Sequence, residues 1–262
     1  MNQNMTPLKI IEQNCNSKIM LLRSLFLRSL SLIYLIAFSS LYFQIQGLFG
    51  DEGIYPAKNL LNIFAEHNKN SVLFLKLPTL LWFSKYISSP LQFIFVGLNS
   101  FSNVEITMFI LCLIGIFISF TILVNIRFFY SYYGFALLWL LYLSFFLVGQ
   151  IFLDYQWDRL LLEVGFLAIF LAPKIKKELI NISLINEAVL HLLRFLLFRV
   201  IFSFGVHFHT SSSKQWQNLT VLTTYFQNQA FPNIFSYICH NILNINLMKV
   251  IAALVLVIQV IN

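Results

Sequence analysis

Long apolar stretches alternate with short polar segments along most of the chain. A helix needs about 20 apolar residues to cross the hydrocarbon core of a bilayer, and several stretches reach that length. Another apolar run closes the printed sequence. We expect membrane spans at residues 29–49, 105–125, 133–153 and 187–206, with the last apolar run at 247–262.

One apolar segment is interrupted several times. Residues 72–93 contain Lys76, Pro78, Lys85 and Pro90. A lipid-facing helix accommodates such breaks poorly, because the backbone groups that they free find no water in the hydrocarbon core. We therefore expect an interfacial or re-entrant segment here.

Polar segments separate the apolar ones. The segments 50–71 and 207–241 are rich in polar and turn-forming residues, and we expect loops at both. Between them, residues 154–173 begin with charges and continue as an apolar run. The whole pattern predicts an all-α fold, a multi-pass transmembrane helical bundle with about five to seven membrane-embedded segments.

Composition supports this fold class. Hydrophobic residues make up 59% of the 262-residue chain, charged residues only 10%, and the mean hydropathy is +0.79. A soluble domain carries about 25% charged residues, so the polar surface is too small to cover a water-soluble globule. The net charge of +7 comes from basic residues that mostly flank apolar segments, as membrane topology signals do. We expect the lipid bilayer as a partner and no nucleic acid.

The basic residues also set the expected orientation, since cytoplasmic loops are enriched in Lys and Arg. Residues 1–28 are basic, and a lysine cluster covers 174–177. We expect a cytosolic N-terminal segment 1–28 and a multi-span membrane domain 29–262 whose polar loops 50–71 and 207–241 are lumenal. A cleavable signal peptide is the alternative for the N-terminus.

Glycosylation sequons follow from this orientation. Asn218 precedes Leu219 and Thr220 in an Asn-x-Thr sequon, and it falls in a loop that we expect in the lumen. Asn4 and Asn181 also stand in sequons but on the expected cytosolic side. The orientation therefore predicts a glycan at Asn218 only.

The segment DYQWDRLLLEVGFLAIFLAP, residues 154–173, gathers charge at one end of an apolar helix. In a helix, Gln156, Arg159 and Glu163 share one face. Arg159 and Glu163 stand four residues apart and can form an ion pair, whereas Asp158 has no evident local partner. Another face carries Trp157, Leu161, Val164 and Ala168.

Ionisable residues at membrane depth indicate either function or a buried charge network. We favour a structural network in which Asp158 or Glu163 meets an arginine of the 187–206 span. Arg199 is preferred to Arg194, because Arg194 can extend towards the interface. The alternative is an intramembrane cavity lined by Asp158, Glu163 and Arg199.

The sequence offers no catalytic set, metal centre or cofactor motif. His207 and His209 are one residue apart, but a third ligand at zinc-site spacing is missing. The serines at 211–213 lack the Gly-x-Ser-x-Gly elbow of a nucleophile, and the glycines form no phosphate-binding pattern. We expect no catalytic residue, no metal ion and no cofactor.

Several motifs follow one another in a fixed order along the chain. They are GLFGDEGIYPA at 47–57, LPTLLWF at 77–83, YQWDRLLLEVGFLAIFLAP at 155–173, LLFRVIFSFGV at 196–206 and WQNLTVLTTYFQNQAFPNIFSY at 216–237. Together they resemble the lipase maturation factors, whose signature Q-W-D-x-L-L-L-E-x-G-F-L-A the third motif closely matches. The resemblance places motif residues at Gln156, Trp157, Asp158, Arg159, Glu163 and Arg199 in the membrane, and at Trp216, Leu219, Thr220, Gln229 and Pro232 in the lumenal loop.

This resemblance implies a function. Lipase maturation factors are multi-span proteins of the endoplasmic reticulum membrane that help secreted lipases fold and assemble, with no enzymatic activity assigned to them. The chain resembles their N-terminal membrane portion, so we expect the family's C-terminal lumenal domain to be absent and the chain to be a partial or truncated member. The alternatives are an intramembrane enzyme, related to the membrane domain of vitamin K-dependent carboxylases, and a transporter.

Overall fold

The computed structural model of the protein is predominantly helical in the residues that it describes. It describes residues 7–67, 73–94, 101–126, 128–173, 182–210, 214–228 and 233–261. Every regular element in these ranges is a helix, which confirms the all-α fold expected from the hydropathy pattern. The chain divides into two compact units, Met1–Val189 and Leu190–Asn262.

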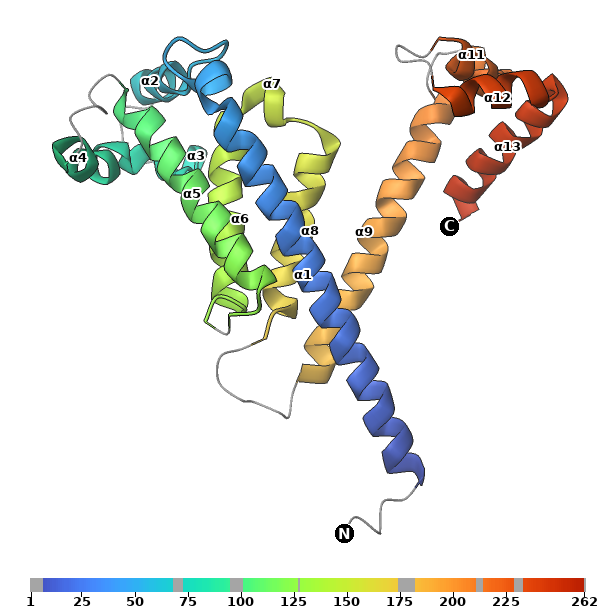
Figure 1. The fold of residues 1–262 in the computed structure, drawn as a ribbon, viewed down its shortest axis with the longest axis horizontal. Coiled ribbons are helices and arrows are strands. Elements are labelled where there is room, and N and C mark those ends of the chain that lie inside the picture. Colours follow the sequence, from blue (N-terminus) through green and yellow to red (C-terminus); the bar gives the residue numbers. More distant parts are fainter. Residues whose placement is uncertain are drawn as a thin grey trace. The chain divides into compact units, whose positions relative to one another are not determined.

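Four helices form the body of the first unit. They are α1 (Pro7–Phe49), α5 (Asn103–Leu123), α6 (Tyr132–Val148) and α8 (Gln156–Leu171). Successive helices run in alternating directions (Figure 1), and α1 packs on α5, α5 on α6, α6 on α8 and α8 on α1. This closed ring of contacts is an antiparallel bundle, in which each helix buries one face against its neighbours.

Helix α1 is longer than the predicted first span. It is one continuous helix of 43 residues, and its strongly apolar part is Met20–Phe49, which begins nine residues before position 29. Leucines on either side of Arg23 and Arg28 keep the helix apolar through this region. The proposed boundary at residue 28 therefore falls inside a helix.

Helix α5 fits the expected span closely. Its 21 residues extend about 31 Å at 1.5 Å per residue, enough to cross the hydrocarbon core. Ser102 and Glu105 form a capping box at its start. After its end, Asn125 adopts a φ of 69°, a left-handed conformation that Asn tolerates well and that often ends a helix.

The predicted span 133–153 is divided. Helix α6 ends at Val148, and a short helix α7 (Gln150–Leu153) follows after Gly149. Gln150 has a φ of 46°, so the chain turns sharply at this point. The apolar hydropathy continues across the break, which is why the sequence pattern alone predicts a single helix.

Short helices gather at the end of the bundle where α1 finishes and α5 begins (Figure 1). The polar segment 50–71, predicted as a loop, contains α2 (Ala57–His67), which buries Ala57 and Leu61. Its apolar residues recur at helical spacing, so the loop prediction was wrong for this part. Residues 72–93 are broken, as expected, into α3 (Leu73–Lys76), the 3-10 helix η1 (Leu80–Phe83) and α4 (Ser84–Ile94).

Aromatic rings fill the centre of the bundle. Tyr34 and Phe38 of α1 meet Tyr142 and Phe145 of α6, with ring centroids 5.7 to 6.2 Å apart. These edge-to-face contacts are favourable for aromatic quadrupoles. A Cβ on Gly115 of α5 would lie 2.7 Å from the Phe38 ring, so α5 approaches α1 closely only because this position is glycine.

The described residues of the second unit form most of α9 (Ile182–Thr210) and several shorter helices. The segment 207–241, predicted as a loop, is partly helical, and α11 packs on α12 and α13. The loop prediction was therefore wrong here too, because apolar residues within a polar segment still support short packed helices. The helices are α9 (Ile182–Thr210), α10 (Lys214–Gln217), α11 (Val221–Gln227), α12 (Ile234–Ile242) and α13 (Ile245–Ile261).

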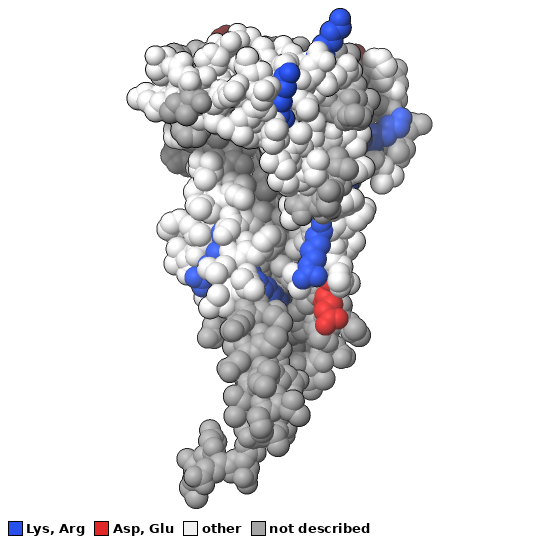
Figure 2. Space-filling view, turned by 90° about the vertical axis from the view of Figure 1, so that its right-hand side faces the viewer, with Lys and Arg blue, Asp and Glu red and all other residues white. Residues whose placement is uncertain are grey.

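Within the described residues, three helical stretches are long and apolar enough to cross a membrane, namely Met20–Phe49, Asn103–Leu123 and Glu187–Val206. Two shorter apolar helices are Tyr132–Val148 and Ile245–Ile258. Many large apolar side chains lie on the outside of the helices. Figure 2 shows one face on which charged residues are sparse.

Candidate functional site

The charged motif segment lies on α8, and one face of this helix is buried. The buried positions follow the spacing of an α-helical face, three or four residues apart. Trp157 and Val164, which we grouped with Leu161 and Ala168, are not among them, whereas Asp158 is. The buried residues are Asp158, Leu161, Leu162, Gly165, Ala168 and Leu171.

Asp158 has a partner that the sequence did not suggest. The Tyr142 hydroxyl of α6 donates a hydrogen bond of 2.5 Å to Asp158 Oδ1, and the Asp158 side chain is only 6% exposed. Its other oxygen, Oδ2, is buried without a hydrogen-bond partner among the described atoms. A hydroxyl that points at a carboxylate offsets part of the cost of burying the charge.

Two more aromatic donors hold the backbone of α8. The Tyr34 hydroxyl of α1 donates to the Leu161 carbonyl at 3.3 Å, and Trp139 Nε1 of α6 donates to the Leu162 carbonyl at 2.9 Å. A helix carbonyl has a second lone pair available for such a bond. Helix α8 is thus attached to α1 and α6 by hydrogen bonds as well as by packing.

Gly165 makes this attachment possible. A Cβ on Gly165 would lie 1.9 Å from the Tyr34 hydroxyl oxygen and 3.4 Å from Trp139 Cδ1. No side chain fits at that distance, so the glycine lets the Tyr34 ring lie against the α8 backbone. The glycine of the Leu-Leu-Leu-Glu-Val-Gly motif is therefore required by close helix packing.

The remaining motif charges face outward. Arg159 forms its ion pair with Asp154, and both side chains are more than half exposed. The predicted pair between Arg159 and Glu163 was therefore wrong, because Asp154, in the turn before α8, lies within reach of the guanidinium. Gln156 is exposed and Glu163 half-buried.

Trp157 is also on the exposed side. It is 66% exposed and stacks on Tyr155, with ring centroids 4.6 Å apart and planes at 9°. A stacked Trp–Tyr pair at a helix end is typical of the interface between the bilayer and water.

The arginines proposed as partners belong to the second unit. Arg194 and Arg199 are exposed on α9, and the charge network that we expected between Arg199 and the acids of α8 stays a prediction. Asp158 already has its hydrogen bond to Tyr142 inside the first unit.

The motif that we expected in a lumenal loop includes the turn between α10 and α11. Trp216 belongs to α10, Leu219 adopts a φ of 56°, and the Thr220 carbonyl accepts a hydrogen bond of 2.8 Å from the Thr224 hydroxyl. Asn218 lies exposed in this turn. Gln229 and Pro232 lie outside the described residues.

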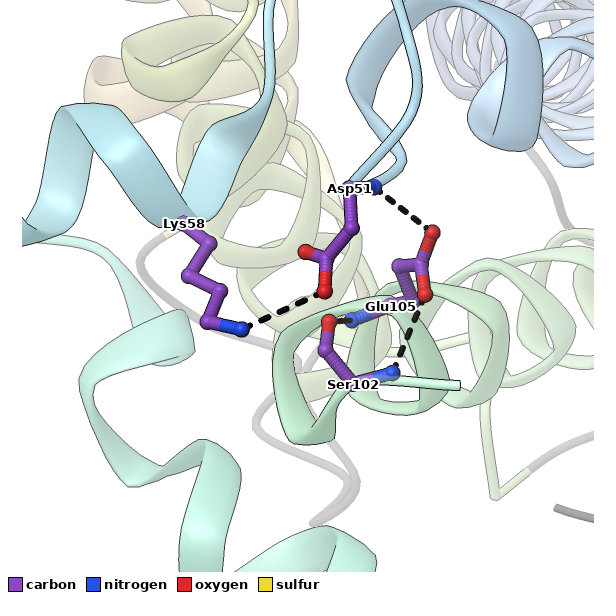
Figure 3. Close-up of polar contacts among 4 residues, drawn as sticks. All are labelled: Asp51, Lys58, Ser102 and Glu105. Atoms are coloured by element: carbon purple, nitrogen blue, oxygen red, sulfur yellow. Dashed lines mark hydrogen bonds and ion pairs between the residues drawn. The ribbon is translucent and has the colours of Figure 1, made fainter. Parts of the chain in front are cut away.

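A second polar cluster lies at the start of α5 and was missed in the sequence (Figure 3). Glu105 is 7% exposed; its Oε1 accepts the backbone N–H of Asp51 at 2.8 Å and its Oε2 that of Ser102 at 3.0 Å. Lys58 of α2 pairs with Asp51 at 3.3 Å. The Glu105 carboxylate therefore ties the turn after α1 to the start of α5.

Gly50, which precedes Asp51, is also needed for the contact between Glu105 and the Asp51 backbone. A Cβ on Gly50 would lie 2.6 Å from Glu105 Oε1 and 2.5 Å from the Gln46 carbonyl oxygen. The Ser-x-x-Glu spacing of a capping box before an apolar run was a signal that could have located Glu105. Nothing in the sequence indicates its bond to Asp51.

No metal centre is evident in the parts of the chain that the structure describes, since no three His, Cys, Asp or Glu side chains gather there. The chemistry of the α8 site is that of packing and hydrogen bonding. The buried carboxylate of Asp158 accepts a hydrogen bond from the Tyr142 hydroxyl, and the exposed Arg159 forms an ion pair with Asp154.

A bundle of long apolar helices, with an apolar exterior and polar anchors between its helices, defines a multi-span helical membrane domain. The family described as lipase maturation factor transmembrane domain matches residues 21–262. The chain belongs to the lipase maturation factor family. This is a family of maturation factors rather than of enzymes, and the match confirms the resemblance noted in the motifs.

Individual relatives agree with this assignment. Lipase maturation factor 2 of Xenopus tropicalis is 40% identical over 228 residues, which are 85% of this chain and 29% of that protein. The human factor 2 is 35% identical over 84% of the chain. Lipase maturation factor 1 of Mus musculus is 30% identical over 84% of this chain and 36% of its own length. No solved structure matches.

Proposed function

We propose that this chain is the membrane part of a factor that assists the folding and assembly of secreted lipases in the endoplasmic reticulum. The single observation that carries the proposal is the match of residues 21–262 to the transmembrane domain of the lipase maturation factors. The chain spans about three tenths of the length of the factor 2 relatives it matches, so their activity is extended to it here as a proposal.

The geometry of the first unit supports a scaffold role. Three aromatic side chains of α1 and α6 hold α8 by donating hydrogen bonds to it, namely Tyr34, Trp139 and Tyr142. Glu105 in turn fixes the turn after α1. A bundle built in this way holds its polar end in one arrangement, on which a client protein can dock.

The side that meets the client follows from charge. By the positive-inside rule, the lysine cluster at 174–177 is expected in the cytosol. The polar segments 50–71 and 207–241 are then expected on the opposite side, in the lumen. Secreted lipases fold in the lumen, so these two segments are the surfaces we propose for client contact.

A chimera tests the proposal independently of what lies beyond residue 262. The 230 matched residues of mouse lipase maturation factor 1 are replaced by the corresponding part of this chain, and the chimera is expressed in cells that lack their own maturation factors. We expect restored secretion of active lipase. A chimera that inserts at normal abundance and restores no lipase activity would contradict the proposal.

The two alternatives predict different results. An intramembrane enzyme would show turnover of a substrate that is lost when one carboxylate, such as Asp158, is replaced. A transporter would carry solute across vesicles that contain the chain. No observation on the described residues favours either one over the scaffold role.

A further inference from the structure

A cleft of about 590 Å³ lies beside the Glu105 cluster, within the first unit. Pockets that bind small molecules commonly have volumes of about 300–1,000 Å³. The cleft is formed by α2, η1, the start of α4 and the residues that lead into α5. Its described lining residues are Lys58, Leu61, Asn62, Leu81, Trp82, Ser84, Lys85, Phe101, Ser102, Asn103 and Val104.

The polar groups of the cleft are mainly hydrogen-bond donors. Lys58 and Lys85 line it, and no acidic residue is among its described lining residues. Asp51 pairs with Lys58 at 3.3 Å, but an ammonium group has three N–H donors, so Lys58 can still bind a second anion. Asn103 also lines the cleft, and an amide side chain can donate N–H groups to an acceptor.

The nearby acid is turned away from the cleft. Both Glu105 oxygens accept backbone N–H groups, those of Asp51 and Ser102, and Figure 3 shows the carboxylate directed at these two amides. Its negative charge is therefore compensated by the backbone. Lys58 shares its charge with Asp51, so the positive charge available to a ligand in the cleft comes mainly from Lys85.

The walls of the cleft are apolar. Leu61 and Leu81 are buried, and Phe101 and Val104 add to the same surface. Trp82 Nε1 donates to the Leu77 carbonyl at 2.9 Å, so the indole is held in place and its single polar group is already used. An apolar chain can therefore lie along these walls without leaving a polar group unpaired.

The cleft also lies at the depth of lipid headgroups. Helix α5 is long enough to cross the hydrocarbon core, and Ser102, at its first turn, lines the cleft. The N-terminal end of a spanning helix meets the membrane surface. Anionic lipids place their headgroups at this depth and their acyl chains in the adjoining hydrocarbon core.

From the donors, the apolar walls and this position, we infer that the cleft between α2, η1 and α4 binds an anionic amphiphile, a molecule with a carboxylate or phosphate head and an apolar chain. The head is bound by Lys58 and Lys85, and the chain lies against Trp82 and Leu81. This inference does not depend on lipase maturation. A fatty acid and an anionic phospholipid share this chemistry.

The test uses the full chain in nanodiscs of neutral phosphatidylcholine. Bromine-labelled oleate is titrated, and quenching of tryptophan fluorescence is measured, with Trp82→Phe used to identify the Trp82 signal. Bromine quenches only on contact, so we expect saturable quenching of Trp82. Brominated phosphatidic acid and inorganic phosphate are titrated separately, to distinguish a fatty acid from a phospholipid and to show that the chain is needed. Tight binding of inorganic phosphate with no binding of either lipid would overturn the inference.

Substitutions locate the binding. Lys58→Gln with Lys85→Gln removes the charge-assisted bonds to the head and is expected to weaken oleate binding by about tenfold or more. Lys214→Gln, on the second unit, is the matched control and should leave the affinity unchanged. Asn62→Phe, at an exposed position, fills the cleft without adding a tryptophan and should abolish quenching while the helical content stays the same. Equal affinity of wild type and the double lysine variant, or equal affinity for oleate and uncharged brominated oleyl alcohol, would overturn the inference.

Discussion

Substituting Gly165 with alanine tests how α8 is held in the bundle. The added methyl carbon would lie 1.9 Å from the Tyr34 hydroxyl oxygen, while the next nearest atoms, Tyr34 Cζ and Trp139 Cδ1, are at 3.1 and 3.4 Å. The steric clash is therefore almost entirely with the Tyr34 hydroxyl oxygen. Either the Tyr34 ring or α8 must move, and the hydrogen bond from Tyr34 to the Leu161 carbonyl is lost.

The expected cost follows from two opposing effects. Overpacking of a well-packed interior costs about 1–3 kcal/mol, while replacing a helical glycine by alanine gains about 0.5–1 kcal/mol. Gly165→Ala should therefore destabilise the chain by up to about 2.5 kcal/mol. Tyr34→Phe alone loses one hydrogen bond within the membrane, which costs about 0.6 kcal/mol.

The double variant gives the sharper result, because Tyr34→Phe removes the atom that the new methyl group meets. We expect Gly165→Ala with Tyr34→Phe to be more stable than Gly165→Ala alone, with a favourable coupling of about 1 kcal/mol. The assay is thermal unfolding of the purified chain in detergent, alongside its abundance in membranes.

The control is Gly47→Ala, where an added Cβ meets no atom within 4 Å. That variant should be neutral or slightly stabilised. If Gly165→Ala behaves like Gly47→Ala, or if the effects of Gly165→Ala and Tyr34→Phe simply add, then contact with the Tyr34 hydroxyl does not limit the approach of α8.

Other predictions concern the polar end, the sequon and the exposed charges. Glu105→Gln loses a charge-assisted hydrogen bond, worth about 1.5–3 kcal/mol, so the amide hydrogens at 50–56 should exchange faster in hydrogen-exchange mass spectrometry. Asn218 should carry a glycan and Asn181 none. Deglycosylation should therefore change the gel mobility of the unmodified chain and of Asn181→Gln, but not that of Asn218→Gln; the reverse pattern would overturn the orientation. Arg159→Ala breaks an exposed ion pair, so unfolding temperature should change by less than the equivalent of about 1 kcal/mol.

Hydropathy was sufficient to predict the fold class and most helices. Runs of apolar residues placed α5 to within about two residues, as expected for strongly apolar segments. Hydropathy did not predict α2, which is an amphipathic helix within a polar segment. The turn signals at Gly50 and Pro56 led to the prediction of a loop there. Hydropathy also failed at Gln150, where a sharp backbone turn leaves no trace in the apolar pattern.

The site was predicted less completely, for a physical reason. The helical spacing of Asp158 with Leu161 and Leu162 could have placed Asp158 on the buried face. Its partner Tyr142 lies on another helix, and single-sequence periodicity carries no information about contacts between helices. The Arg159 pair was assigned to the wrong acid because an i, i+4 rule ignores residues in the turn before the helix, such as Asp154.

We infer that the motif on α8 holds the bundle together and does not act on a substrate or client. The most direct measurement uses Asp158→Ala in the mouse factor 1 chimera, with membrane abundance and secreted lipase activity measured in the same cells. Loss of the carboxylate leaves the Tyr142 hydroxyl buried and unpaired, at a cost of about 1–3 kcal/mol, and adding Tyr142→Phe should relieve it. We predict lower abundance with unchanged lipase activity per chimera molecule, and recovery of abundance in the double variant. Normal abundance of Asp158→Ala with loss of lipase activity would contradict the claim.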